Sequence, residues 1–354
     1  MKGVLSQFQI EEPIARWEGY GCGHINGTYL VSCDTGRKYI LQKINTKVFN
    51  QPVQLMENIS SVTDHLAKKN PDPRASLHLI PTKDGKTCCQ DSEGEWWRML
   101  DFVESTICLQ QAESEKDLYY TGLAFGRFQS ELADFPADTL HEPIKDFHNT
   151  PVRYTQLHRA METNFQNRLT RCRSELSFAL AREQEAGAIV EKLQSGQLPL
   201  RVTHNDTKLN NILFDAKTRT PLCVIDLDTI MPGSALYDYG DAIRFGASTA
   251  AEDEQDLSKV QCDMALFRAY TKGFWEGCSG NLTDLEIQML PIGAKLITLE
   301  CGVRFLTDYL NGDTYFRTHY ADQNLHRART QFKLVADMES KWDTMHEIVK
   351  EIIK

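Results

Sequence analysis

The stretch Val202–Asp215, VTHNDTKLNNILFD, and the run Val224–Asp228, VIDLD, carry the strongest signal in this chain. The first stretch reads as H-x-D-x-x-x-x-N, and the second ends an apolar strand in the pair D-x-D. Aspartate and asparagine side chains supply hard oxygen ligands, and an aspartate can also accept a proton from a hydroxyl group. The order and the close spacing of these groups favour a chemical role over turn residues that only satisfy backbone groups.

Kinase-type phosphoryl transferases place a catalytic Asp, a metal-binding Asn and a metal-binding Asp in this same order. Phosphoryl transfer requires a carboxylate that orients the attacking hydroxyl group and oxygen ligands that hold Mg²⁺ on the phosphates. We therefore expect Asp206 to be the catalytic base, and Asn211 and Asp226 to bind Mg²⁺. The alternative is a chance match, because H-x-D alone occurs in many chains.

The composition is that of a globular protein with 354 residues, 41% of them hydrophobic and 25% charged, which suits two domains or one bilobal unit. A formal net charge of -10 argues against nucleic acid or an anionic membrane surface as a partner. ATP remains compatible, because a nucleotide site needs only local cations. The cysteines lack zinc spacing, the first residues lack the apolar core of a signal peptide, and no stretch is long enough for a membrane span. We expect a cytoplasmic protein with reduced thiols.

The first hundred residues predict a β-rich region, and the rest predicts helices. Strands are expected over 28–31, 38–44, 77–81 and 96–103, and a helix over 52–69. Helical periodicity then covers most of 114–133, 151–195 and 252–354. These patterns predict a β-rich nucleotide-binding lobe at 1–104 and a helical lobe at 105–354 that contains the catalytic loop and the acceptor pocket.

Glycines and a lysine in the first lobe are candidates for binding the nucleotide phosphates. Gly21 and Gly23 belong to a glycine-rich hairpin, whose backbone N–H groups can approach phosphate oxygens closely. Lys43 lies one strand later, where kinases carry a phosphate-binding lysine, and Glu57 is expected to hold it. The alternatives are a solvated strand lysine and a surface glutamate. Asp101 lies in the segment 99–104, which ends a strand at the lobe boundary, where extended backbone is expected to bond the adenine.

With these residues in hand, the chain resembles the aminoglycoside phosphotransferase and choline kinase superfamily, which has a protein-kinase-like fold. The loop with His204 and Asp206, and an Asp-Leu-Asp in place of Asp-Phe-Gly, resemble its small-molecule branch. A closer resemblance is to N-acetylhexosamine 1-kinases. It is carried by the segments 23–26, 39–45, 56–59, 204–211, 225–233, 240–246, 304–310 and 324–329. The resemblance therefore runs from about Gly19 to Arg329, and it implies an α+β, bilobal, protein-kinase-like fold.

This resemblance implies transfer of the γ-phosphate of ATP, with Mg²⁺, to the anomeric hydroxyl group of N-acetylglucosamine or N-acetylgalactosamine. It implies a sugar pocket that contains His24, Arg244, Phe245 and Arg304. Other interpretations stay open for three of these residues. Arg244 could brace Asp241 or Asp238, Phe245 could be an ordinary core residue, and Arg304 could belong to a structural ion pair.

The chain departs from this resemblance at two positions. Position 27 is Gly, where the closest relatives are expected to carry an acidic residue, and we expect this difference to change recognition near the glycine-rich hairpin. Lys43 stands where some relatives carry Arg, and these two cations contact phosphates with different geometry.

Two other functions compete with a sugar kinase. The first is a kinase for another small alcohol, such as choline, an amino alcohol or an aminoglycoside; such cationic substrates favour acidic or aromatic cages, and no dense one is evident. The second is a nucleotide-binding pseudokinase, against which the intact Lys43, Asp206, Asn211 and Asp226 argue. We expect a monomer or a weak dimer that binds a sugar and ATP.

Overall fold

A computed structural model describes residues 1–21 and 25–354 of the chain, which divide into two compact units. The first unit contains residues 1–108, 134–145 and 212–232, and the second contains 109–133, 146–211 and 233–354. The single boundary expected after residue 104 therefore differs from the observed division. Two later segments return to the first unit, and one of them carries the Asp-Leu-Asp pair.

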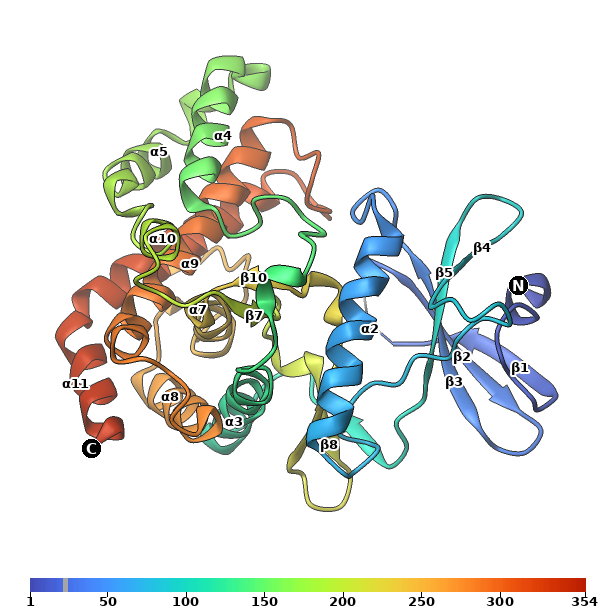
Figure 1. Cartoon of the computed structure of the whole chain (residues 1–354). Helices are drawn as coiled ribbons and strands as arrows, with labels where there is room; N and C mark the ends of the chain where they lie inside the picture. The colour runs from blue at the N-terminus through green and yellow to red at the C-terminus, as the bar shows by residue number, and fades with distance from the viewer. Residues whose placement is uncertain (22–24) are drawn as a thin grey trace. The chain divides into compact units, whose positions relative to one another are not determined.

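The first unit is built on a five-stranded antiparallel sheet in the order β1-β2-β3-β5-β4 (Figure 1). Its strands are β1 (Ile14–Gly19), β2 (Gly27–Cys33), β3 (Lys38–Ile44), β4 (Cys89–Gln90) and β5 (Trp96–Asp101). The unit also contains α1 (Lys2–Leu5), α2 (Pro52–Lys69) and a short 3₁₀ turn, η1 (Ala137–Thr139). The predictions of a strand over 38–44 and a helix over 52–69 are confirmed. The strand predicted over 77–81 is wrong: Leu79 forms only an isolated bridge with Leu100, and Pro81 has no N–H group to extend a ladder.

The two faces of this sheet have different contents. Tyr39 and Leu41 of β3 point into a hydrophobic core that also contains Trp97 and Met99 of β5 and the apolar side chains of α1. Because side chains alternate along a strand, the residues between them point to the opposite face. On that face, the Arg98 guanidinium contacts the Met56 sulfur of α2. The two faces thus separate an apolar core under α1 from a polar group beside α2.

A smaller sheet completes the first unit. It has the order β6-β8-β9, with β6 (Thr106–Cys108), β8 (Ile212–Asp215) and β9 (Pro221–Val224). The chain then enters η5 (Leu227–Thr229) and β10 (Met231–Gly233), which ends at the division between the units. The Asn58 side chain of α2 donates hydrogen bonds to the carbonyl oxygens of Ile230, at 3.0 Å, and His141, at 2.9 Å. These bonds tie the segment after the Asp-Leu-Asp pair to α2.

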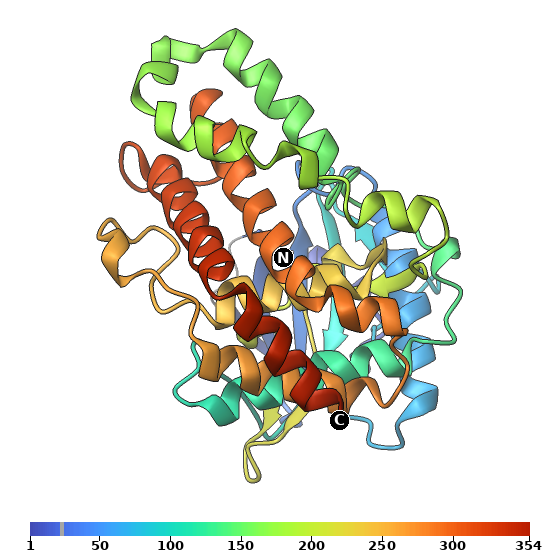
Figure 2. The ribbon, with the colours of Figure 1, turned by 90° about the vertical axis from the view of Figure 1, so that its left-hand side faces the viewer.

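The second unit is helical. Its helices are α3 (Glu115–Glu131), α4 (Thr150–Thr163), α5 (Arg173–Leu180), α6 (Val190–Gln194), α7 (Ala235–Gly246), α8 (Met264–Cys278), α9 (Asp284–Leu310), α10 (Gln323–Ser340) and α11 (Trp342–Ile353), joined by the 3₁₀ segments η2 (Phe165–Arg171), η3 (Glu183–Glu185) and η6 (Leu257–Lys259). Helix α9 is buried along most of its length and begins at a capping box between Thr283 and Glu286. Figure 2 shows α10 and α11 lying along it. No helix in the described parts of the chain is both long and apolar enough to cross a membrane.

Helices α3 and α8 pack with their backbones in direct contact at glycines. A Cβ atom at Gly122 of α3 would lie 2.2 Å from the Tyr270 carbonyl oxygen, and one at Gly273 of α8 would lie 1.9 Å from that of Tyr119. Any side chain at these positions would force the helices apart. This crossing fixes α3, which carries one of the side chains that anchor the loop predicted to be catalytic.

Candidate active site

The loop that contains the predicted catalytic residue lies in the second unit, between β7 (Arg201–Thr203) and η4 (Leu209–Asn211). The Asp238 carboxylate of α7 accepts hydrogen bonds from the backbone N–H groups of His204, at 3.0 Å, and Asn205, at 2.7 Å. It also accepts one from the Gln129 side chain of α3, at 2.7 Å. Burial raises the pKa of the Asp238 carboxyl, and the nearby His204 and these hydrogen bonds offset part of that rise. The start of the loop is therefore anchored by a fully buried carboxyl group.

Asp206 is contacted by two other side chains of the same loop. The Asn211 Nδ2 donates to the Asp206 carbonyl oxygen at 2.8 Å and to its Oδ2 at 3.1 Å. The Lys208 Nζ lies 2.6 Å from the Asp206 Oδ1. Burial lowers the pKa of Lys208, but the carboxylates of Asp206 and Asp241 outweigh this effect and hold it above its usual value. The structure therefore joins Asp206 and Asn211, as the motif predicts, and adds a cation.

Sequence reasoning missed Lys208. Its signal is its position, because it lies two residues after Asp206 in the same loop. A lysine at this point reaches the carboxylate predicted to be catalytic and can also attract an anion that approaches it.

A second group of charges holds the middle of the loop. The Asp241 carboxylate accepts a hydrogen bond from the Thr207 N–H at 2.9 Å and pairs with Arg244 at 2.8 Å. Arg244 also pairs with Glu252 at 3.0 Å and is 7% exposed. Burial raises the pKa of Asp241, but the charges of Arg244 and Lys208 hold it below its usual value. Arg244 therefore braces Asp241, which is the alternative to a role in the sugar pocket. Phe245 is 39% exposed, so it is not a core residue.

Arg304 of α9 has an unusual environment for a charged side chain. Its guanidinium group lies over the ring of Phe147, at 5.0 Å from the centroid, and over that of Phe316, at 5.5 Å. Among the described residues, no carboxylate lies within 4 Å of the Arg304 guanidinium, so Arg304 does not form the structural ion pair that was its alternative interpretation. One turn earlier, the buried Glu300 binds the Nδ1 of His148 at 2.8 Å. Burial raises the pKa of Glu300, and the charges of His148 and Arg304 bring it below its usual value.

The predicted pair between Lys43 and Glu57 in the first unit is wrong. The Lys43 Nζ lies 2.9 Å from the Glu95 carboxylate, and Glu57 binds His141 at 2.7 Å. The physical reason is the alternation of side chains along β3, which places Lys43 on the face with Tyr39 and Leu41 rather than on the face beside α2.

The Asp-Leu-Asp pair follows β9 at a sharp change of backbone direction. Asp226 has a left-handed backbone with φ of 60° and precedes η5. Asp228 is buried and accepts hydrogen bonds from the Arg98 Nη1 and the Asn26 Nδ2. Asp226 is exposed whereas Asp228 is buried, although the two residues are only two positions apart.

The structure describes some, but not all, of the other residues predicted to bind the nucleotide and the sugar. Gly21 has φ of 79°, a conformation that favours glycine, whereas Gly23 and His24 lie outside the described residues. The Asp101 N–H donates to the His78 carbonyl oxygen at 2.9 Å, and its carboxylate pairs with Arg37 at 3.1 Å. The Asp101 N–H is thus already engaged within the protein. At Gly27 a Cβ atom would approach nothing closer than 3.5 Å, so glycine there is not required by space.

The residues predicted to bind Mg²⁺ have the oxygen donors that this ion prefers. Because the Asn211 Nδ2 is held by Asp206, the Asn211 Oδ1 is turned away from that carboxylate and can act as a ligand. No group of three or more His, Cys, Asp or Glu side chains within the described residues could hold a metal ion. An amide oxygen and a carboxylate are each ligands that suit a hard cation such as Mg²⁺.

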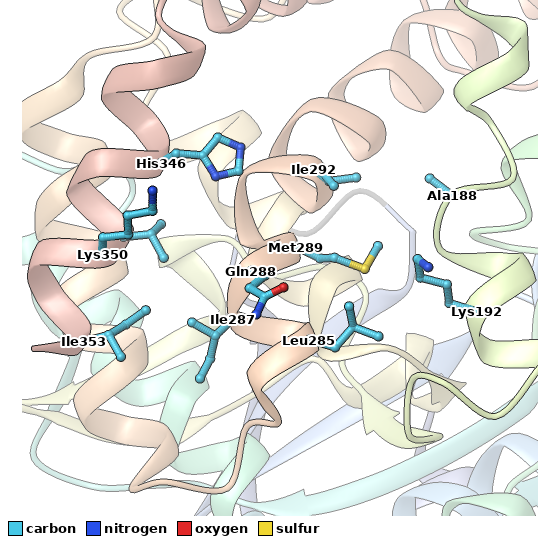
Figure 3. A pocket seen from close by; sticks show the side chains of 11 residues that line it. Ala188, Lys192, Leu285, Ile287, Gln288, Met289, Ile292, His346, Lys350 and Ile353 are labelled. Atoms are coloured by element: carbon cyan, nitrogen blue, oxygen red, sulfur yellow. The ribbon is translucent and has the colours of Figure 1, made fainter.

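The second unit also has an apolar groove that contains none of these residues (Figure 3). It is lined mainly by α9 and α11, through side chains such as Ile287, Met289 and Val349, with Lys192 and Lys350 as its cations. The described residues that line it are mostly apolar, and none of them is an aspartate or a glutamate.

Comparison with known proteins places the chain in a family. A model described as the phosphotransferase enzyme family matches residues 16–270, which is more than half of the chain. The structure is similar to an aminoglycoside phosphotransferase from Alicyclobacillus acidocaldarius, with a TM-score of 0.66 at 12% identity over 99% of this chain and 96% of that one.

Two further solved structures share the fold. A microcompartment-associated aminopropanol kinase matches with a TM-score of 0.60 at 15% identity, over 98% of this chain and 97% of that one. An amicoumacin kinase in complex with AMP-PNP and Ca²⁺ matches with a TM-score of 0.59 at 15% identity, over 96% and 91%. These likenesses confirm the protein-kinase-like fold, with a small sheet-rich N-terminal region and a helical C-terminal region. The chain belongs to the phosphotransferase enzyme family.

Proposed function

We propose that this small-molecule phosphotransferase uses ATP to phosphorylate the anomeric hydroxyl group of an N-acetylhexosamine. The observation that carries the reaction type is the arrangement of Asp206 with Asn211 and Lys208, on a loop anchored by Asp238. The identity of the acceptor rests on the sequence resemblance described above.

In the proposed reaction, Asp206 orients the acceptor hydroxyl group and takes its proton. The acceptor oxygen attacks the γ-phosphorus, the bond from that phosphorus to the bridging oxygen of ADP breaks, and ADP leaves with the bond electrons. Each oxygen of a carboxylate has two lone pairs, so the contacts to Asn211 and Lys208 leave acceptor capacity for the hydroxyl proton. Lys208 provides positive charge beside the reacting groups, and we assign Asn211 and Asp226 the ligand oxygens for Mg²⁺, which would neutralise charge on the phosphates.

The charges around this loop favour a neutral acceptor over a cationic one. Asp241 is paired with Arg244, and Glu300 is held by His148, so neither carboxylate is free to pair with an amine. Arg304 adds a cation that lies over two aromatic rings. A choline, amino-alcohol or aminoglycoside acceptor calls for an acidic or aromatic cage, and the two aromatic rings here already face the Arg304 guanidinium. A hydroxyl-rich sugar suits hydrogen-bond donors beside an aromatic wall.

The deciding experiment is an ADP-release screen with Mg²⁺-ATP against N-acetylglucosamine, N-acetylgalactosamine, simple hexoses, choline, amino alcohols and aminoglycosides. We expect turnover with one or both N-acetylhexosamines. Turnover with an amine-bearing acceptor and with no sugar would reject the proposed acceptor. Nucleotide binding without turnover on any acceptor would favour the pseudokinase interpretation.

Replacement of Arg304 tests the acceptor pocket separately. We expect Arg304→Ala to raise the KM for the sugar roughly tenfold, with little change in the KM for ATP, because a charge-assisted hydrogen bond to the acceptor would be lost. Arg268→Ala is the matched control, since Arg268 forms an exposed ion pair with Glu351 on the same unit. Equal changes in both KM values would mean that Arg304 is a structural residue.

A further inference from the structure

We infer that Arg98 of β5, and not Lys43 of β3, binds the phosphates of the nucleotide in this enzyme. This inference rests on the proposed use of a nucleoside triphosphate. It gives a role to a buried arginine that no motif singles out, and it places the phosphate-binding cation on a neighbouring strand.

The register of the sheet determines which cation faces which way. Lys43 pairs with Trp97 across β3 and β5, and Trp97 belongs to the apolar core under α1. Gln42 pairs with Arg98, and directly paired residues point to the same face. Arg98 therefore lies on the opposite face from Lys43, which is also the face that holds Met56 of α2.

The ion pairs agree with this division. Lys43 binds Glu95, and the carboxylates of Asp91 and Glu93 also act on it, so it belongs to the acidic turn between β4 and β5. Arg98 instead binds Asp228, the second carboxylate of the Asp-Leu-Asp pair. The cation next to the predicted metal-binding segment is thus Arg98.

The contacts around Arg98 reproduce the parts that a kinase-type phosphate site requires. Its Nε donates to Gln42 at 2.8 Å, and its Nη1 donates to Asp228. Asp228 also accepts a hydrogen bond from Asn26, at the end of the glycine-rich hairpin. Phosphate-binding lysines in kinases are held by a carboxylate on a helix, whereas here Asp228 would hold the guanidinium. Within the described residues the Nη2 has no hydrogen-bond partner, so this nitrogen can donate to a phosphate oxygen.

Burial of this ion pair is difficult to explain by stability alone. The side chains of Arg98 and Asp228 are 4% and 6% exposed. Removing two charges from water often costs as much as their attraction returns, and apolar replacements are frequently as stable. A phosphate ligand accounts for the charge, since a guanidinium group that is already desolvated and oriented binds an anion strongly.

The experiment compares the binding of adenosine, ADP and ATP to the full chain by calorimetry, with no acceptor present. We expect Arg98→Met to weaken ATP binding roughly tenfold or more while adenosine binding stays within about twofold. Lys43→Met is the matched control and should leave both affinities within about twofold, because its partner Glu95 is on the other face. The reverse result, with ATP binding lost in Lys43→Met and kept in Arg98→Met, would overturn the inference.

Two further variants keep the test valid if Arg98→Met folds poorly because Asp228 loses its partner. Arg98→Lys keeps the charge but loses the planar fork, and we expect a smaller selective loss of ATP affinity. The double variant Arg98→Met with Asp228→Asn removes both buried charges and should therefore fold. We expect it to lose affinity for ATP while its affinity for adenosine stays close to that of wild type. Equal losses of affinity for ATP and for adenosine in these variants would show that Arg98 is purely structural and would reject the inference.

Failure of the wild-type protein to bind ATP would instead reject the nucleotide donor. Inactivity on sugars alone would reject only the proposed acceptor.

Discussion

The loop around Asp206 and the β3–β5 region differ in how well the sequence predicts which side chains lie together. In the loop, the functional side chains are a few residues apart, and the spacing itself brings Asp206, Lys208 and Asn211 together. In the sheet, the relevant side chains come from separate strands, and a shift of one residue along β3 moves a side chain to the other face. Local motifs are therefore reliable where the chemistry is local. They fail where strand register decides which group faces the site.

The largest expected effect is at the centre of the loop. Asp206→Asn should lower kcat by about 10²- to 10⁴-fold, because general-base catalysis contributes that much, while the affinity for ATP changes little. Steady-state kinetics and nucleotide titration measure the two quantities. Unchanged turnover would show that Asp206 is not the catalytic base, and the loop would then be no better predicted from the sequence than the sheet.

A smaller loss is expected when the additional cation of the loop is removed. Lys208→Met keeps the length of the side chain but removes the charge beside Asp206, and we expect kcat to fall about 10²-fold. Lys192→Met, in the apolar groove of the same unit, is the control and should be fully active. If both variants kept wild-type kcat, Lys208 would only neutralise Asp206.

A smaller effect, on stability rather than on activity, is expected at Asp215. This residue ends the stretch Val202–Asp215 and belongs to the first unit. The Asp215 carboxylate accepts N–H groups from Thr218, at 3.0 Å, and Lys217, at 2.9 Å, and binds Arg74 at 3.0 Å. These bonds lower its pKa from 3.8 to about 2. A lowered pKa in the folded state contributes stability above pH 3.8, and this contribution is lost as the pH falls from there to 2.

We therefore expect the Tm of Asp215→Asn to be below that of wild type at pH 6, with the difference shrinking between pH 4 and pH 2. Thermal melts across this range measure it. A Tm difference that does not depend on pH would show that the carboxylate charge is not what stabilises this turn.

The smallest effect is expected at the misassigned partner of Lys43. Glu57 is exposed and binds His141, so Glu57→Gln should change stability by less than about 0.5 kcal/mol and leave the KM for ATP unchanged. A large rise in that KM would mean that Glu57 does hold a phosphate-binding cation when nucleotide is bound. Such a result would restore the pairing that the motif predicts and weaken the case for Arg98.

Several elements could be predicted from the sequence because their signals are local. The strand Lys38–Ile44 and the helix Pro52–Lys69 begin and end at the predicted residues, since alternation and helical periodicity each act over a few positions. The order of Asp206, Asn211 and Asp226 predicts phosphoryl transfer, and the match to the phosphotransferase enzyme family agrees with that prediction. The protein-kinase-like fold follows from the strand-rich and helix-rich regions together with the family resemblance, and the similar solved structures confirm it. The sugar acceptor is a proposal drawn from resemblance.

The sequence by itself determined the loop predicted to be catalytic, because Asp206 and Asn211 lie in one short segment, where Asn211 and the neighbouring Lys208 each contact Asp206. Only the tertiary structure decided the environment of that loop and of the sheet. Asp238 and Gln129 reach the loop from α7 and α3, and Asp228 meets Arg98 across 130 residues of sequence. No spacing rule connects such distant positions, because chain reversal and strand register are set by packing of the whole unit.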